Sequence, residues 1–130
     1  MRNTRHDTFG RNDRRRAERW GRYAEILGLM VLWLKGYRIL ARRFRVGGVG
    51  EIDIIARRGQ VIAFVEVKAR SDEATAAFAL TPRQQKRIAR TAEVFLARHR
   101  VPAACIVRFD ALLVSGFFPR HLVDVWRLMP

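Results

Sequence analysis

The sequence predicts an α/β protein in which a mixed central β-sheet is flanked by helices, arranged like a three-layer sandwich. Its 130 residues, 49% of them hydrophobic, suit a single domain with one core. Helix, three strands, helix and two strands in that order are typical of a layered α/β domain. The helical patterns occupy about 14–35 and 82–99, and the strand-like runs occupy 37–46, 51–57, 61–69, 104–115 and 121–128.

The net charge indicates a polyanionic partner. Against 12 acidic residues the chain carries 26 basic ones, a formal charge of +14. Nucleic acid is the first expectation and an anionic membrane surface the second. The single cysteine, Cys105, excludes an internal disulfide framework and fits a reducing cytoplasm. We expect Cys105 to pack in the core from a strand, and the few Cys and His residues argue against a zinc site.

Residues 1–19 form an arginine-rich segment with few large apolar residues. Such a composition predicts a flexible, disordered or loosely helical basic arm, so the folded domain is expected to span 20–130. Non-specific phosphate contact and simple solubilisation are both open roles for the arm.

The first helix is expected to run from about Arg14 to Lys35 and to end before Gly36. Its uncharged run, Ile26–Leu34, is much shorter than the roughly 20 apolar residues of a bilayer span. No cleavage motif follows that run, which disfavours a signal peptide. We therefore expect the run to be buried, in part against a second subunit. On the sequence alone, Glu25 reads as a surface residue.

Two β-branched runs on either side of Gly59 predict a hairpin. Strict alternation would place Glu51, Asp53 and Ile55 on one face, and Ile52, Ile54 and Ala56 on the other. A turn at Gly59-Gln60 pairs Arg58 with Val61 and sets Asp53 opposite Glu66, with Cβ atoms roughly 5 Å apart. A turn at Arg58-Gly59 instead makes the two acids diagonal neighbours, roughly 7–8 Å apart.

Either register brings two carboxylates close to the ammonium of Lys68. Two negative charges about 5 Å apart repel by roughly 3 kcal/mol at an effective dielectric near 20. A bound divalent cation would reverse the sign of that interaction. The blander alternative is a solvated face with a Glu–Lys pair, but the apolar residues on both faces of the hairpin favour a cleft.

These residues also carry a resemblance. Asp53 followed by Glu66-Val67-Lys68 resembles the metal-binding signature of the PD-(D/E)XK nucleases, which include Holliday-junction resolvases and many restriction enzymes. A more specific resemblance is to the YraN-like family of small, uncharacterised bacterial proteins. It rests on three motifs at 35–40, 50–53 and 64–68, and it covers about Trp20 to Trp126. The resemblance implies a restriction-endonuclease-like fold.

The resemblance also implies roles for individual residues. Asp53, Glu66 and Lys68 would be catalytic. Asp53, Glu66, the carbonyl of Val67 and Glu25 would hold Mg²⁺ or Mn²⁺, because hard cations prefer oxygen ligands. Around Glu25 the chain reads Tyr-Ala-Glu where the family commonly has Gly-Glu. Glu51 and Gln85 would be accessory residues, although Gln84 stands where the family often has Lys.

The second helix is expected to begin with Thr81 as N-cap and Pro82 in its first turn, after a mobile loop at 71–81. Its first half is strongly basic, which fits either a solvated face or a phosphate-binding one. Together with two arginines of the first strand, the expected nucleic-acid contacts are Arg42, Arg43, Arg83, Lys86, Arg87 and Arg90.

The C-terminal region offers fewer functional candidates. We expect Arg108 and Asp110 to pair on one strand face, although Asp110 could also approach the metal. His121 reads as a structural imidazole near a loop, and Trp126 as a residue that packs on the sheet.

The function that these observations favour is metal-dependent phosphodiester hydrolysis of DNA, with branched and single-stranded forms as candidate substrates. The first alternative is a nucleic-acid-binding protein without turnover, and the second is an anionic-membrane binder that uses the basic arm. The protein is expected to be cytoplasmic and not inserted in a membrane. A homodimer is expected if the resolvase analogy holds, because a junction needs two active sites.

Overall fold

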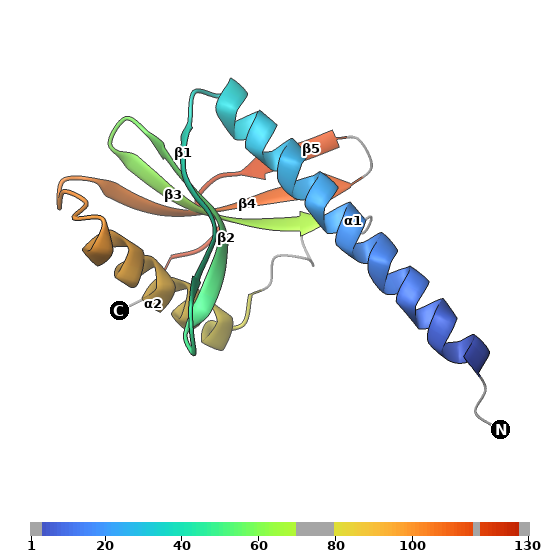
Figure 1. Cartoon of the computed structure of the whole chain (residues 1–130). Helices are drawn as coiled ribbons and strands as arrows, with labels where there is room; N and C mark the ends of the chain where they lie inside the picture. The colour runs from blue at the N-terminus through green and yellow to red at the C-terminus, as the bar shows by residue number, and fades with distance from the viewer. Residues whose placement is uncertain (1–3, 70–79, 116–117, 128–130) are drawn as a thin grey trace.

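A computed structural model describes residues 4–69, 80–115 and 118–127 (Figure 1), with side chains described from residue 14 onward except at 17, 115 and 118. It contains two helices and five strands in the order that the sequence predicts. They are α1 (Thr4–Leu34), β1 (Arg38–Val46), β2 (Gly50–Arg58), β3 (Val61–Ala69), α2 (Pro82–Arg98), β4 (Ile106–Ser115) and β5 (Phe118–Leu122).

The five strands form one mixed sheet in the order β1-β2-β3-β4-β5. Neighbouring strands are antiparallel except for β3 and β4, which are parallel. A parallel pair needs a long crossover connection, and α2 lies in the segment that supplies it. The prediction of an α/β protein with a mixed sheet and flanking helices is confirmed.

The two helices cover opposite faces of the sheet (Figure 1). Leu32 of α1 belongs to a buried cluster with Ala63 and Val65 of β3. Phe95 of α2 belongs to a second cluster with Ile62 and Phe64. Because successive side chains of a strand point to opposite faces, the alternation along β3 separates the two clusters. The core therefore lies in two layers, one on each side of the sheet.

The hairpin of β2 and β3 has the register of a turn at Gly59-Gln60. Arg58 pairs with Val61, and the ladder continues to Ile54 opposite Val65. Gly59 has a φ of +60°, a conformation that suits glycine in a tight hairpin turn. The predicted alternation of β2 is wrong at Ile52, however. Ile52 packs in the same cluster as Ile55, so the alternation of faces breaks between these two residues, where Asp53 lies.

α1 begins at Thr4, ten residues before the predicted start at Arg14, and so includes residues 4–19 of the predicted basic arm. That segment lacks proline and is rich in arginine, which has a favourable helix propensity. The helix ends in a Schellman motif as expected from Gly36, whose φ is +88°. The Gly36 N–H donates to Trp33 and the Tyr37 N–H donates to Leu32.

Within the single chain, the run at 26–34 is buried on one face only, and burial of its other face against a second subunit stays a prediction. Leu32 is fully buried, whereas other large side chains are exposed, with Trp33 at 71% and Leu34 at 74%. The exposed residues also include Tyr23, Ile26 and Met30. Within the described parts of the chain, no helix combines the length and apolar character needed to cross a bilayer.

Two expectations near the C-terminus also need correction. β5 spans Phe118–Leu122, earlier than the predicted strand at 121–128, so His121 lies in a strand, one residue before its end. Cys105 lies one residue before β4, although it does pack against the α2-side cluster. Most of the predicted loop at 71–81 falls outside the described residues.

Candidate functional site

Asp53 marks the point where β2 separates from β3. The paired residues end at Ile54 and Val65, one position short of Asp53 and Glu66. Beyond that point, β3 is bonded to a side chain of β2: Oδ2 of Asp53 accepts a hydrogen bond of 2.8 Å from the backbone N–H of Val67. The carboxylate is therefore fixed against the strand that carries Glu66 and Lys68.

Glu66 has one paired and one unpaired carboxylate oxygen. Its Oε1 lies 3.0 Å from Nζ of Lys68, and both side chains are about one-quarter exposed. Its Oε2 is buried and has no hydrogen-bond partner among the described residues. A buried charged oxygen without a partner is costly, and it calls for an explanation such as a bound ion or water.

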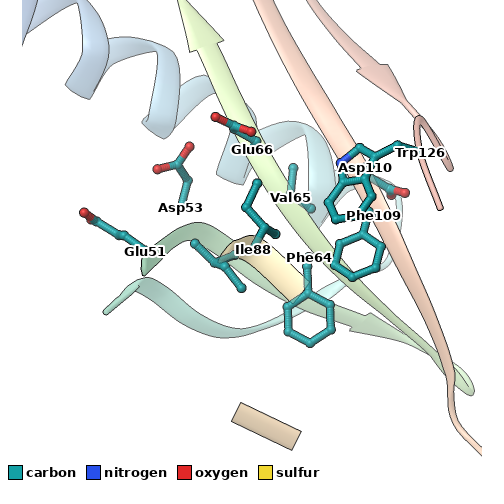
Figure 2. A pocket seen from close by; sticks show the side chains of 10 residues that line it. Glu51, Asp53, Phe64, Val65, Glu66, Ile88, Phe109, Asp110 and Trp126 are labelled. Atoms are coloured by element: carbon teal, nitrogen blue, oxygen red, sulfur yellow. The ribbon is translucent and has the colours of Figure 1, made fainter. Parts of the chain in front are cut away.

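Asp53 and Glu66 line the same small cavity, of about 40 Å³. Figure 2 shows Glu51, Asp53 and Glu66 on one side of it and the rings of Phe109 and Trp126 on the other. One water needs roughly 10–15 Å³ of such volume, so the cavity has room for a small ion with a water. Glu51, Asp53 and Glu66, three of the predicted site residues, therefore border one cavity.

Burial is the main reason why the pKa of Asp53 is raised to about 6. The hydrogen bond from Val67 opposes the shift, while the negative charges of Glu66, Glu51 and Glu25 add to it. The charge of Glu66 therefore disfavours the ionised form of Asp53. A divalent cation between them would remove that penalty.

The residues present fit a hard divalent cation. Asp53 and Glu66 would supply oxygen ligands from two strands, and the Oε2 atom of Glu66, which has no partner among the described residues, could bind the cation. Within the described residues, no cluster of three or more Asp, Glu, His or Cys side chains is close enough to hold a metal ion. Such an ion would hence rely on the two carboxylates, backbone oxygen such as the Val67 carbonyl, and water. Mg²⁺ commonly binds in this way.

Glu25 lies in a neighbouring cleft of about 510 Å³, together with Asp53, Val67 and Arg43. Both of its oxygens are occupied. Oε1 accepts a hydrogen bond of 3.2 Å from Arg42, and Oε2 accepts bonds of 3.1 and 3.0 Å from Nε and Nη2 of Arg43. Two of the predicted nucleic-acid contacts are therefore bound to a predicted metal ligand.

The basic half of α2 presents one continuous exposed face. Arg83, Lys86, Arg87 and Arg90 follow the i, i+3, i+4, i+7 spacing of a single helix face, and all four are exposed. Arg87 lines a groove with Glu51 and Glu66, and a second groove with Arg45 of β1 and the loop between β1 and β2. This face therefore adjoins the carboxylates.

The two glutamines of α2 have different positions. Gln84 completes a capping box with Thr81, and it lines the groove that contains Glu51 and Glu66. Gln85, the predicted accessory residue, donates its amide to the carbonyl of Leu80 instead. The spacing Thr-x-x-Gln at 81–84 was the signal that could have identified Gln84.

A second polar cluster surrounds Asp110 on β4. Arg108 donates two hydrogen bonds of 2.8 Å to its carboxylate, which confirms the predicted pair. His121 donates from Nε2 at 2.8 Å and the Asp124 N–H donates at 2.9 Å. The ammonium of Lys35 lies 3.0 Å from Nδ1 of His121 and can only donate, so Nδ1 accepts and the proton of the ring is assigned to Nε2. Burial raises the pKa of Asp110, but these hydrogen bonds outweigh it and hold the pKa below its usual value.

The wall of the cavity contains residues that the sequence did not identify as part of a site. Trp126 stacks on Phe109 with ring centroids 4.0 Å apart, and both line the cavity with Asp110 and Ile88. The sequence predicted only that Trp126 packs on the sheet, because the residues that it contacts are distant from it in the sequence. The segment after β5 thereby closes one side of the site.

Comparisons with known proteins place the chain among bacterial relatives. Residues 24–114 match the model of the family described as "Uncharacterised protein family UPF0102". A UPF0102 protein of Paramagnetospirillum magneticum is 49% identical over 116 residues, which cover 86% of this chain and 90% of that protein. One of Methylorubrum populi is 51% identical over 109 residues, or 83% and 86% of the two chains. A third, of Methylobacterium nodulans, is 47% identical over 128 residues and covers 98% of both. The chain therefore belongs to the UPF0102 family, the YraN-like family that its three motifs resemble.

Proposed function

We propose that this protein is a metal-dependent nuclease that hydrolyses a phosphodiester bond, with DNA as the expected substrate. The pair of Asp53 and Glu66 carries the proposal. One carboxylate has a raised pKa, the other has a buried oxygen without a partner among the described residues, and both line one cavity. Perturbed carboxylates in a cavity are typical of catalytic and metal-binding sites.

We also propose that the fold is restriction-endonuclease-like, as the resemblance implies. The order of elements supports it: α1, three antiparallel strands, α2 and a strand parallel to β3. In this arrangement the acid of β2 and the Glu-x-Lys motif of β3 meet at the end of the hairpin that is remote from its turn. This placement supports the proposed fold.

The proposed roles follow from the contacts of each side chain. When bound, Mg²⁺ or Mn²⁺ supplies positive charge against the phosphate and lowers the pKa of a coordinated water. Asp53 and Glu66 would hold that ion, and the Val67 N–H fixes the orientation of Asp53. The ammonium of Lys68 lies 3.0 Å from Glu66 and would orient the attacking water or stabilise charge on the phosphate.

The exposed basic face of α2 supports a nucleic-acid substrate. Arg83, Lys86, Arg87 and Arg90 can contact backbone phosphates without reading the base sequence. The chain's charge of +14 acts in the same direction, because it attracts a polyanion from any orientation.

The proposal is tested by cleavage of labelled branched, flapped and single-stranded DNA, with RNA as a comparison, in Mg²⁺, Mn²⁺ or EDTA. The isosteric variants Asp53→Asn and Glu66→Gln should lose at least about 100-fold in rate. Glu93→Gln removes an exposed carboxylate of α2 and serves as the matched control.

Three outcomes separate the readings. Cleavage that needs metal and disappears in both site variants supports the nuclease. DNA binding without cleavage in any condition favours the non-catalytic binding protein. Undiminished cleavage by Asp53→Asn would assign the activity to another site or to a contaminant.

A further inference from the structure

We infer that Glu25 anchors a phosphate-binding subsite formed by Arg42 and Arg43, and that it is not a metal ligand. The inference rests on the proposed function for its ligand class, a backbone phosphate of the nucleic acid next to the one that is cleaved. It assigns to three residues a joint role that their separate predicted roles did not include.

The first observation is that Glu25 is committed to two guanidinium groups. Its side chain is 9% exposed, and three hydrogen bonds of 3.0–3.2 Å occupy both oxygens. A cation bound to Glu25 would have to displace these donors or lie beside two like charges. Hydrogen bonds between guanidinium and carboxylate groups are among the strong ones in proteins, so this arrangement disfavours metal binding by Glu25.

The second observation is the backbone of β1. Neighbouring residues of a regular strand point to opposite faces, so Arg42 and Arg43 would not normally reach one carboxylate. Arg43 has a φ of +49°, a left-handed conformation that is uncommon outside glycine. This break in the strand accounts for both guanidinium groups meeting Glu25. Unusual backbone conformations of this kind often occur at functional sites.

The third observation is the surface that the two arginines present. Their side chains are 53% and 55% exposed, although their anchor is buried. A guanidinium has five N–H donors, and Glu25 takes one from Arg42 and two from Arg43. The remaining donors can reach a ligand, and the cluster of two arginines and one glutamate keeps a net positive charge.

The location of the cluster identifies the ligand. Arg43 and Glu25 line the cleft of about 510 Å³ that Asp53 and Val67 also line. The planar guanidinium matches phosphate oxygens in a bidentate manner. A nucleic-acid strand whose scissile phosphate lies at Asp53 and Glu66 would place a neighbouring phosphate in this cleft.

The test uses DNA binding in EDTA, where neither metal nor turnover contributes. Glu25→Gln removes a negative charge, so simple electrostatics predicts tighter binding to the polyanion. If Glu25 anchors the two arginines, its loss should have the opposite effect. The affinity for DNA should fall roughly 5- to 10-fold, and the slope of the logarithm of affinity against the logarithm of salt concentration should decrease by about one phosphate contact. Affinity for Mn²⁺ alone should stay within about twofold in Glu25→Gln, whereas Glu66→Gln should lose about tenfold or more.

A second variant keeps the test informative if Glu25→Gln does not fold. Arg43→Lys preserves the charge but not the forked geometry, and it should weaken DNA binding to a similar extent. Arg38→Lys, the same change at an exposed arginine elsewhere on β1, should not.

Unchanged or tighter DNA binding by Glu25→Gln, or a loss of Mn²⁺ affinity equal to that of Glu66→Gln, would overturn the inference. An absence of DNA binding by the unaltered protein would overturn it as well. Failure of the unaltered protein to cleave DNA would instead count only against the proposed nuclease activity, since this assay does not depend on turnover.

Discussion

The Asp53 carboxylate accepts a 2.8 Å hydrogen bond from the backbone N–H of Val67, the residue between Glu66 and Lys68. The contact joins the acid of β2 to the centre of the Glu-Val-Lys motif on β3. It keeps the two carboxylates at one cavity even though the paired residues of the strands end one position earlier. The geometry of the proposed site therefore depends on the hydrogen bond between the Asp53 side chain and the Val67 N–H, which lies beyond the last paired residues of the two strands.

The raised pKa of Asp53 predicts a specific pH dependence of stability. Because the folded-state pKa, about 6, is higher than the usual 3.8, the fold disfavours the ionised form. The free energy of unfolding should fall as the pH rises from about 4 to about 7. Asp53→Asn keeps an acceptor for Val67 and should be more stable than the unaltered protein above about pH 7, by up to about 3 kcal/mol.

Urea unfolding in EDTA across this pH range measures the difference, with Glu93→Gln as the control at an exposed acid. The advantage of Asp53→Asn should vanish near about pH 4, where both side chains are uncharged. An advantage that does not change with pH would show that Asp53 titrates normally.

Gly50 should tolerate substitution poorly, because β2 begins against α2. A Cβ at this position would lie 2.8 Å from Oγ1 of Thr91 and 3.4 Å from the carbonyl oxygen of Arg87. Thr91 is fully buried, so it has little room to move. Gly50→Ala should cost roughly 1–3 kcal/mol of stability. Gly47→Ala, where a Cβ meets nothing within 4 Å, should cost little, and thermal unfolding compares the two. Equal melting temperatures would be inconsistent with the close contact.

The Asp110 cluster should contribute strongly to stability. Asp110→Ala leaves Arg108, His121 and the Asp124 N–H without their acceptor, and it should cost about 3–5 kcal/mol near neutral pH. Because the pKa of Asp110 is lowered, this contribution should persist down to about pH 4 and disappear only below it. Asp124→Asn keeps the backbone donor and should change the unfolding midpoint far less. Similar losses in the two variants would argue against the role of the buried carboxylate.

The exposed apolar surface of α1 is the expected interface of a homodimer, the assembly that the resolvase resemblance implies. Its exposed residues follow helical spacing: Tyr23, Ile26, Met30, Trp33 and Leu34. We expect light scattering to give a dimer mass for the unaltered protein and a monomer mass for Trp33→Ser. Ile106→Ser alters an exposed residue elsewhere and should remain dimeric. A dimer that survives Trp33→Ser would have another interface.

The hairpin could be predicted from the sequence because its determinants are local. Two β-branched runs and a glycine at the turn limited the register to two possibilities, and both place Asp53 near Glu66. The capping of α2 by Thr81 and the end of α1 at Gly36 follow from equally local signals.

Contacts between distant segments could not be predicted in the same way. The face on which Ile52 packs depends on where β2 separates from β3, and a rule of strict alternation takes no account of that separation. The binding of Glu25 by two arginines depends on the left-handed conformation of Arg43, and arginine has no preference that would predict this conformation. The stacking of Trp126 on Phe109 depends on how the chain returns after β5.

Calorimetric titration with Mn²⁺ tests the central claim most directly, since it measures the cation site without a substrate. The unaltered protein should bind the ion at about pH 8, and Asp53→Asn and Glu66→Gln should each lose affinity by about tenfold or more, whereas Glu93→Gln should not. Binding should also weaken as the pH falls below about 6, where Asp53 takes up a proton. No binding by the unaltered protein, or equal binding by all four proteins, would contradict a cation site at Asp53 and Glu66.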